Sequence, residues 1–111
     1  MTASVAVYEG QIGQSVYAAA KAGVIRLTLV AARYLSSAGI RVNAIAPATM
    51  ETPIMKSVGD GAIAKLTANV PFPKRLGTPE EYADAAASLI ANGYVNGEVL
   101  RLDGAQRFTP R

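Results

Sequence analysis

Tyr17 and Lys21 are the two side chains whose types and spacing indicate chemistry. They stand four residues apart with three alanines between them, so on a helix both would project from one face, about 6 Å apart. A fixed positive charge favours the phenolate over the phenol, which would let the tyrosine exchange a proton with a bound substrate. A core tyrosine next to a solvent-facing lysine shows the same spacing. The pair alone therefore leaves both interpretations open.

Other common catalytic groups are excluded by composition. The sequence contains no cysteine and no histidine, which rules out disulfides, thiolate catalysis, cysteine-bound zinc, Ser-His-Asp triads and imidazole metal sites. We therefore expect no metal site. Acid–base chemistry must fall to tyrosine, lysine or a carboxylate.

Charge and hydrophobicity indicate a globular protein. Half of the 111 residues are hydrophobic and 17% are charged, as is usual for one domain. The basic residues behind the net charge of +3 are scattered, with Lys74-Arg75 as the only adjacent pair, whereas nucleic-acid binders cluster them. No apolar run approaches the ~20 residues of a membrane span, and no secretory signal opens the chain. We expect a soluble, cytoplasmic protein that binds neither nucleic acid nor membrane.

The elements that would position Tyr17 and Lys21 alternate between strand and helix. Residues 1–7 are typical of the end of a strand and a loop, and residues 14–38 should form a long helix that ends at Gly39. A short apolar run over 40–47 predicts a strand buried on both faces. The helical stripe expected to be buried consists of Val16, Ala20, Val24, Leu27, Ala31 and Leu35.

The second half repeats this alternation after an irregular stretch. Prolines and glycines interrupt residues 48–77, which we interpret as a loop-rich lid over a substrate with one short helix at 62–69. A capping box at Thr78, with Pro79 next and Glu81 third, predicts a helix from 79 to about 91. Residues 98–103 should contain a last strand. The apolar stripe expected on the second helix consists of Tyr82, Ala83, Ala86, Leu89 and Ile90.

This order predicts an α/β fold with parallel strands joined by right-handed crossovers. Two or three such strands would leave long unpaired edges, because parallel sheets occur almost only in larger units covered on both faces. We therefore expect residues 1–111 to be a single partial domain.

Several motifs together resemble the short-chain dehydrogenase/reductase family. Its signature is a catalytic Tyr-x-x-x-Lys on a long helix, with a serine upstream at the end of the preceding strand, where Ser4 stands here. Asn-Ala-Ile-Ala-Pro at 43–47, followed by Thr52, matches the strand and loop beside the nicotinamide, and residues 100–104 match the last strand. The resemblance implies the C-terminal portion of a Rossmann-like doubly wound parallel sheet whose N-terminal strands are missing.

Within that family the chain is similar to type 2 3-hydroxyacyl-CoA dehydrogenases, on the stretches 2–6, 9–11, 70–77 and 96–99. This resemblance implies an NAD-dependent oxidoreductase that interconverts a secondary alcohol and a ketone. It also implies an acyl-CoA or similar hydroxy or keto substrate and a homo-oligomer, either dimer or tetramer. The residue that would choose NAD over NADP lies outside the chain, so the NAD preference rests on the resemblance alone.

The resemblance also implies roles for individual residues. Tyr17 would be the general acid/base, Ser4 would hydrogen-bond the substrate oxygen, and Lys21 would support Tyr17 and hold the nicotinamide ribose. Gln11 would contact the substrate near the acyl carbonyl. A strand-end hydroxyl at Ser4 and a turn residue at Thr52 are structural alternatives that the sequence leaves open. The implied cofactor-binding residues are Tyr17, Lys21, Pro47 and Thr52.

The sequence departs from the family pattern in two ways. Pro47-Ala48 replaces the family's Pro-Gly, and alanine tolerates a positive φ poorly, so the backbone could differ there. The Gly-rich phosphate turn, the acidic ribose-reading residue and the catalytic asparagine have no counterpart.

Because of these absences we expect a fragment with negligible activity on its own, and Met1 would fall inside a central strand. The alternative hypothesis is a non-catalytic oligomerisation module derived from such an enzyme.

Overall fold

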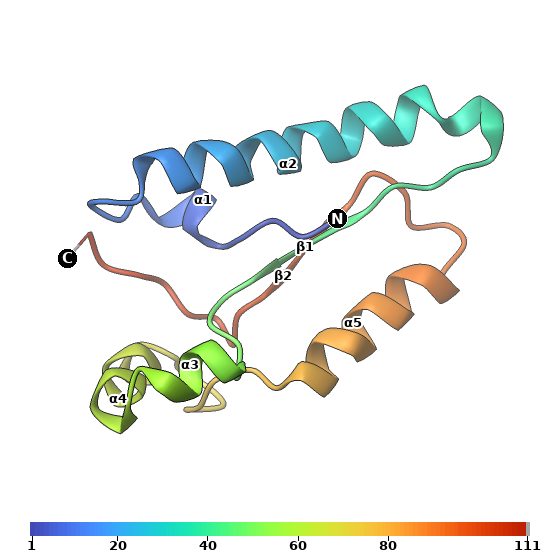
Figure 1. Cartoon of the computed structure of the whole chain (residues 1–111). Helices are drawn as coiled ribbons and strands as arrows, with labels where there is room; N and C mark the ends of the chain where they lie inside the picture. Colours follow the sequence, from blue (N-terminus) through green and yellow to red (C-terminus); the bar gives the residue numbers. More distant parts are fainter. Residues whose placement is uncertain (111) are drawn as a thin grey trace.

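The computed structural model describes residues 1–110 and shows two parallel strands between helices (Figure 1). The α/β class and the parallel pairing predicted from the sequence are confirmed. In chain order the elements are α1 (Ala6–Glu9), α2 (Ser15–Tyr34), the 3-10 helix η1 (Ser36–Ala38), β1 (Ala44–Pro47), α3 (Pro53–Ser57), α4 (Asp60–Ala68), α5 (Pro79–Ala91) and β2 (Val99–Leu102).

The sheet is centred on β1. Ala44 lies opposite Val99 of β2 in the parallel register, and on the other edge Thr2 forms a single parallel bridge with Ile45. The strand end expected at the N-terminus is present as a short extended segment: the Ile45 amide donates to the Met1 carbonyl at 3.0 Å, and the Ala3 amide donates to the Ile45 carbonyl at 2.8 Å. The chain then turns into α1. The first three residues of β1 are buried, as predicted for a strand covered on both faces.

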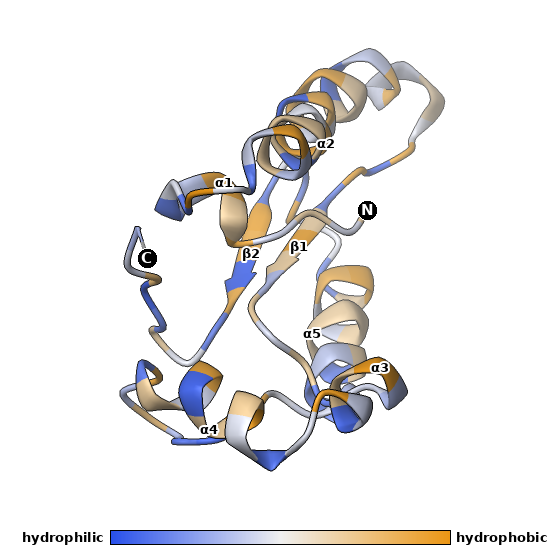
Figure 2. Cartoon of the chain, turned by 60° about the vertical axis from the view of Figure 1, so that its left-hand side comes forward, coloured by the Kyte–Doolittle hydropathy of each residue, from blue (hydrophilic) through white to orange (hydrophobic). Residues whose placement is uncertain are grey.

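Helix α2 covers the sheet on one side and α5 on the other (Figures 1 and 2). The loop before β2 approaches α2 closely at Gly97, which has a φ of +80°. A Cβ at this position would lie 2.9 Å from Cδ1 of Leu29 and 3.5 Å from Cβ of Ala32. Glycine is required here both for its backbone conformation and for its lack of a side chain.

The helix itself is confirmed, but the buried stripe predicted for α2 is right only in part, since Val24, Ala31 and Leu35 are half-buried. The fully buried residues of α2 are Thr28 and Ala32, whereas Val16 is 83% and Leu27 is 53% exposed. Apolar residues occur on more than one face of this helix, so periodicity could not tell which face meets the sheet. Thr28 and Ala32 face inward, Leu29 and Ala32 approach Gly97, and Val16 and Leu27 point outward.

By length and average hydropathy alone, α2 would be apolar enough to cross a membrane. Its apolar residues are interrupted by Lys21, Arg26 and Arg33, and Thr28 and Ala32 pack inward. We therefore interpret α2 as a helix that covers the sheet on one side and is exposed on the other.

Helix α5 begins and ends on side-chain caps. The predicted capping box is confirmed: the Thr78 hydroxyl accepts from the Glu81 amide at 3.2 Å, and the Glu81 carboxylate accepts from the Thr78 amide at 2.8 Å. Of the predicted stripe, Ala83 and Ile90 are exposed.

At the other end of α5, the Arg41 guanidinium donates to four carbonyl oxygens at 2.7–3.1 Å. These carbonyls belong to Leu89, Ile90, Asn92 and Val95. An arginine is well suited to this place, because it satisfies the free carbonyls and complements the negative end of the helix dipole.

The segment 48–77 contains two helices where one was expected. Helix α4 covers the predicted short helix, while α3 was missed because Pro53 looked like an interruption. It occupies the first turn of α3, where proline is favoured, and the Thr52 hydroxyl caps that turn by accepting from the Met55 amide at 3.3 Å. The two ends of the segment meet where the Glu51 amide donates to the Gly77 carbonyl at 2.7 Å.

The molecule is elongated, with extents of 49 × 29 × 23 Å and a radius of gyration of 15.1 Å. A compact domain of this length would have a radius of gyration of about 13 Å. The buried apolar residues are mostly alanines, and many large apolar side chains remain exposed.

Candidate active site

One cleft of about 280 Å³ collects four of the residues singled out from the sequence: Ser4, Gln11, Tyr17 and Pro47. They come from the turn before α1, the loop after it, the first turn of α2 and the end of β1. The fold thus brings side chains that are up to 43 positions apart in the sequence to one place. The other lining residues are Val5, Ala6, Gln14, Ala48, Thr49, Leu66 and Phe108.

Ser4 lies where the bridged segment turns into α1 and is 9% exposed. Its Oγ accepts a hydrogen bond from the Ala6 amide at 3.2 Å. A hydroxyl both accepts and donates, so this bond leaves the Ser4 proton available for an oxygen in the cleft. The structural role and the proposed chemical role of Ser4 are therefore compatible.

Tyr17 and Lys21 share one face at the start of α2, as their spacing predicted. The Lys21 ammonium lies 5.9 Å from the centre of the Tyr17 ring and donates to the Thr2 carbonyl at 3.1 Å. An ammonium has three N–H donors, so this one bond leaves capacity for a second partner. Tyr17 is 47% exposed and open to the cleft.

The residues implied for the cofactor are not all at the cleft. Pro47 and Ala48 line it, and the Ala48 amide donates to the Leu102 carbonyl at 2.9 Å, extending the parallel ladder. Within residues 1–110, Ala105 is the non-glycine residue with a positive φ, so Ala48 causes no such strain. Thr52 caps α3 and is not among the lining residues; its role toward a cofactor stays a prediction.

Three of the lining residues, Ala48, Thr49 and Leu66, belong to residues 48–77, which the sequence predicts as a lid, but none of them was singled out as a site residue. The other lining residues that were not singled out are Val5, Ala6, Gln14 and Phe108. Leu66 belongs to α4 and Phe108 to the C-terminal tail, which no local pattern connects to Tyr17. Gln14 could have been found from its position directly before α2, because that position is close to Tyr17 in the first turn of the helix.

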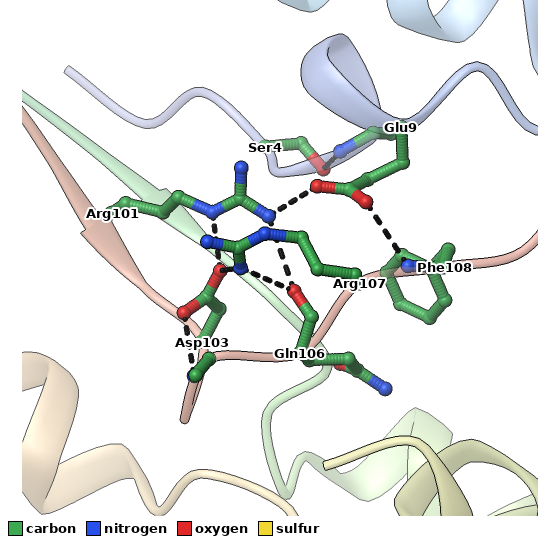
Figure 3. A network of polar contacts seen from close by, with 9 residues as sticks. Ser4, Glu9, Arg101, Asp103, Gln106, Arg107 and Phe108 are labelled. Atoms are coloured by element: carbon green, nitrogen blue, oxygen red, sulfur yellow. Dashed lines mark hydrogen bonds and ion pairs between the residues drawn. The ribbon is translucent and has the colours of Figure 1, made fainter. Parts of the chain in front are cut away.

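An ion-pair cluster joins α1, β2 and the C-terminal tail (Figure 3). The Arg101 guanidinium bonds the carboxylates of Glu9 and Asp103, and Arg107 adds a 3.0 Å bond to Asp103. Arg101 also lies over the Tyr8 ring at 4.8 Å. Burial alone would lower the pKa of Arg101, but its bonds to the two carboxylates outweigh burial and raise that pKa above its usual value.

Tyr17 in the cleft and Lys21, which is not among the lining residues, offer donors that fit one end of a dinucleotide. A phenol and an ammonium one helical turn apart suit the hydroxyls of a nicotinamide ribose. The sequence offers no Gly-rich turn for the pyrophosphate. Within residues 1–110 no group of three or more acidic side chains could hold a metal ion.

A family model described as enoyl-(acyl carrier protein) reductase matches residues 1–105. The chain is 50% identical over 109 residues to the 3-hydroxyacyl-CoA dehydrogenases type-2 of Bos taurus and Homo sapiens, covering 98% of this chain and 42% of each relative. It is 42% identical to an acetoacetyl-CoA reductase of Synechocystis, covering 86% of this chain and 41% of the relative.

A crystal structure of 3-hydroxyacyl-CoA dehydrogenase type-2 from Mycobacterium avium superimposes with a TM-score of 0.95 at 76% identity. The superposition covers 99% of this chain and 43% of that one. The chain thus spans about two fifths of the length of the relatives it matches.

Proposed function

The chain belongs to the short-chain dehydrogenase/reductase family, and we propose that it carries the acid–base side of an oxidoreductase that interconverts a 3-hydroxyacyl-CoA and its ketone. The observation that carries this proposal is the meeting of Ser4 and Tyr17 at one cleft, with Lys21 one turn away. The relatives named for 3-hydroxyacyl-CoA and acetoacetyl-CoA support the substrate class.

The chain's own residues divide the proton chemistry. The Tyr17 hydroxyl holds the proton that passes to or from the substrate oxygen, and Ser4 donates a second hydrogen bond to that oxygen as charge develops there. The Lys21 cation stabilises the tyrosinate left after proton transfer. A nicotinamide dinucleotide, when bound, supplies the hydride acceptor or donor.

The remaining cleft residues suit the acyl part of the substrate. The Gln11 amide offers a donor and an acceptor for an acyl carbonyl, while Leu66 and Phe108 offer apolar surface to the carbon chain. This division of polar and apolar lining is what a 3-oxoacyl group requires.

Without a phosphate-binding turn in its sequence, the purified chain should show negligible turnover of acetoacetyl-CoA with NADH. Titration with NAD should leave its free energy of unfolding unchanged, because a ligand stabilises only a protein that binds it. Turnover by the chain alone would contradict this part of the proposal.

The proposal is tested in a chimera that joins this chain to the N-terminal part of the Mycobacterium avium relative. Given 76% identity over the shared part, we expect the chimera to oxidise NADH with acetoacetyl-CoA. Tyr17→Phe should lower kcat by about 10²–10⁴-fold, the usual contribution of a general acid/base. Tyr94→Phe is the matched control, because Tyr94 is fully exposed. A folded chimera whose kcat is insensitive to Tyr17→Phe would refute the assigned role.

A second candidate function is self-association, favoured by the outward face of α2. Val30 is 60% and Tyr34 82% exposed, and exposed apolar patches of this kind mark interaction surfaces. We propose a homo-oligomer that buries this face. Sedimentation as a monodisperse monomer at high concentration would contradict it.

A further inference from the structure

We propose that the C-terminal tail, residues 104–110, is a latched wall of the substrate cleft, and that the Arg101–Glu9 ion pair is the latch that limits which acyl groups enter. The identity of the acyl group rests on the proposed function. The latch rests only on contacts within the chain.

One carboxylate joins three segments of the chain (Figure 3). One oxygen of Glu9, on α1, bonds Arg101 of β2, and the other accepts from the Phe108 amide of the tail at 3.1 Å. The Glu9 side chain is 6% exposed, so water does not compete freely for it. Arg101 adds a second hold on the tail by donating to the Gln106 carbonyl at 3.2 Å.

The tail is also tied to the opposite side of the cleft, at α4. The Gln106 side chain is 1% exposed and donates to the Leu66 carbonyl at 2.7 Å. Beyond the latch, the Ile12 amide donates to the Pro110 carbonyl at 3.1 Å. Residues 106–110 therefore connect α4 to the loop that follows α1.

These attachment points coincide with the cleft lining. Leu66 accepts the Gln106 bond through its carbonyl and lines the cleft, Phe108 donates to Glu9 and lines it, and Gln11 follows Glu9 by two residues. Two apolar lining residues are thus attached to this network: Phe108 directly to Glu9, and Leu66 through Gln106. Arg101 and Glu9 are absent from the lining and act as positioning residues.

The charges explain why both partners are needed. Glu9 and Asp103 are both nearly buried and share the Arg101 guanidinium. Replacing Arg101 by a neutral side chain leaves the Glu9 carboxylate without its cation, while Asp103 keeps its ion pair with Arg107. Glu9 would then turn toward water and release the Phe108 amide. The tail could move away from the cleft, which would make room for a longer acyl chain.

Amide hydrogen exchange on the purified chain tests the latch without any activity. Arg101→Met and Glu9→Gln should each speed exchange of the Phe108 amide at least tenfold. Arg26→Met, at an exposed position on α2, should leave it unchanged. The amides of β1 report global unfolding, and Glu9→Gln is the milder variant if Arg101→Met does not fold. Exchange at Phe108 as slow as in the unaltered chain would overturn the latch.

Kinetics in the chimera test the consequence for the substrate. Arg101→Met should raise the ratio of kcat/KM for a ten-carbon 3-oxoacyl-CoA to that for acetoacetyl-CoA by about tenfold, mainly through KM, and Arg101→Lys should restore part of the original ratio. An unchanged ratio despite faster exchange would overturn the link to selectivity. A chimera inactive on every acyl-CoA would contradict the proposed function, while the exchange result would still decide the latch.

Discussion

The cleft end of the molecule and the outer face of α2 differ in whether their side chains find partners within the chain. Around the cleft, Glu9, Asp103 and Arg101 all have partners within the chain, and no buried side-chain nitrogen or oxygen of residues 1–110 lacks a hydrogen bond. On α2, by contrast, Leu27 and Val30 are more than half exposed. The buried polar groups are thus all paired, whereas the apolar face of α2 is left uncovered.

This difference shows that the geometry of the site and the stability of the fold have separate origins. Hydrogen bonds and ion pairs are directional and short-ranged, so neighbouring segments can satisfy them without a further partner. Apolar burial depends on area removed from water, and two short strands with two covering helices remove little. We therefore expect a formed site on a scaffold of low stability.

The largest effect on stability should come from removing the Arg41 hydrogen bonds at the end of α5. Arg41→Met would remove the side-chain donor from the carbonyls of Leu89, Ile90 and Asn92, while Val95 keeps its bond from Asn43, and it should lower the free energy of unfolding by about 3 kcal/mol. Arg26→Met, on the exposed part of α2, should change it by less than about 0.5 kcal/mol. Urea denaturation of both variants measures the difference. Equal effects would mean that the polar contacts are not what stabilises the fold.

A smaller loss is expected where α2 meets the sheet. Gly97→Ala places a Cβ 2.9 Å from Leu29 at a φ of +80°, which should cost about 2 kcal/mol. At Gly93 nothing lies within 4 Å and no positive φ occurs, so alanine there should be neutral or stabilising by up to about 1 kcal/mol. Thermal unfolding of the two variants provides the comparison, and a neutral Gly97→Ala would show that α2 is not held closely against the sheet.

The apolar face should govern association rather than stability. The double variant Leu27→Lys, Val30→Lys should abolish self-association in sedimentation while changing the free energy of unfolding of the monomer by less than about 0.5 kcal/mol. Ala87→Lys with Ser88→Lys adds the same charge to exposed positions of α5 and should leave association intact. Association that survives the first variant would move the interface elsewhere.

The smallest effect is a pH dependence at the start of α5. The hydrogen bond from Arg75 and then the bond from the Thr78 amide lower the pKa of Glu81 from 4.5 to about 2. Between these values the unfolded chain binds the proton more readily, so the stabilisation is complete above pH 4.5 and is lost as the pH falls toward 2. Glu81→Gln should flatten this part of the stability profile, whereas Lys56→Met, which removes a different exposed pair, should retain it.

Local sequence signals predicted the elements that depend on local physics. The capping box at Thr78 and Glu81 predicted the start of α5, because the bonds join residues three apart. The spacing of Tyr17 and Lys21 predicted their shared face for the same reason. The short helix α1 was missed because its single turn has no side-chain cap, and α3 was missed because Pro53 was interpreted as an interruption although it occupies the first turn.

By itself the sequence determined the α/β order, the helix that carries Tyr17 and Lys21, the exclusion of cysteine and histidine chemistry, and the family. Only the tertiary structure decided which face of α2 meets the sheet and that Leu66 and Phe108 join Ser4 at one cleft. It also placed Arg101 and Glu9 against each other across 92 positions of sequence. Periodicity and capping act within a few residues, whereas these contacts depend on how the helices pack against the sheet.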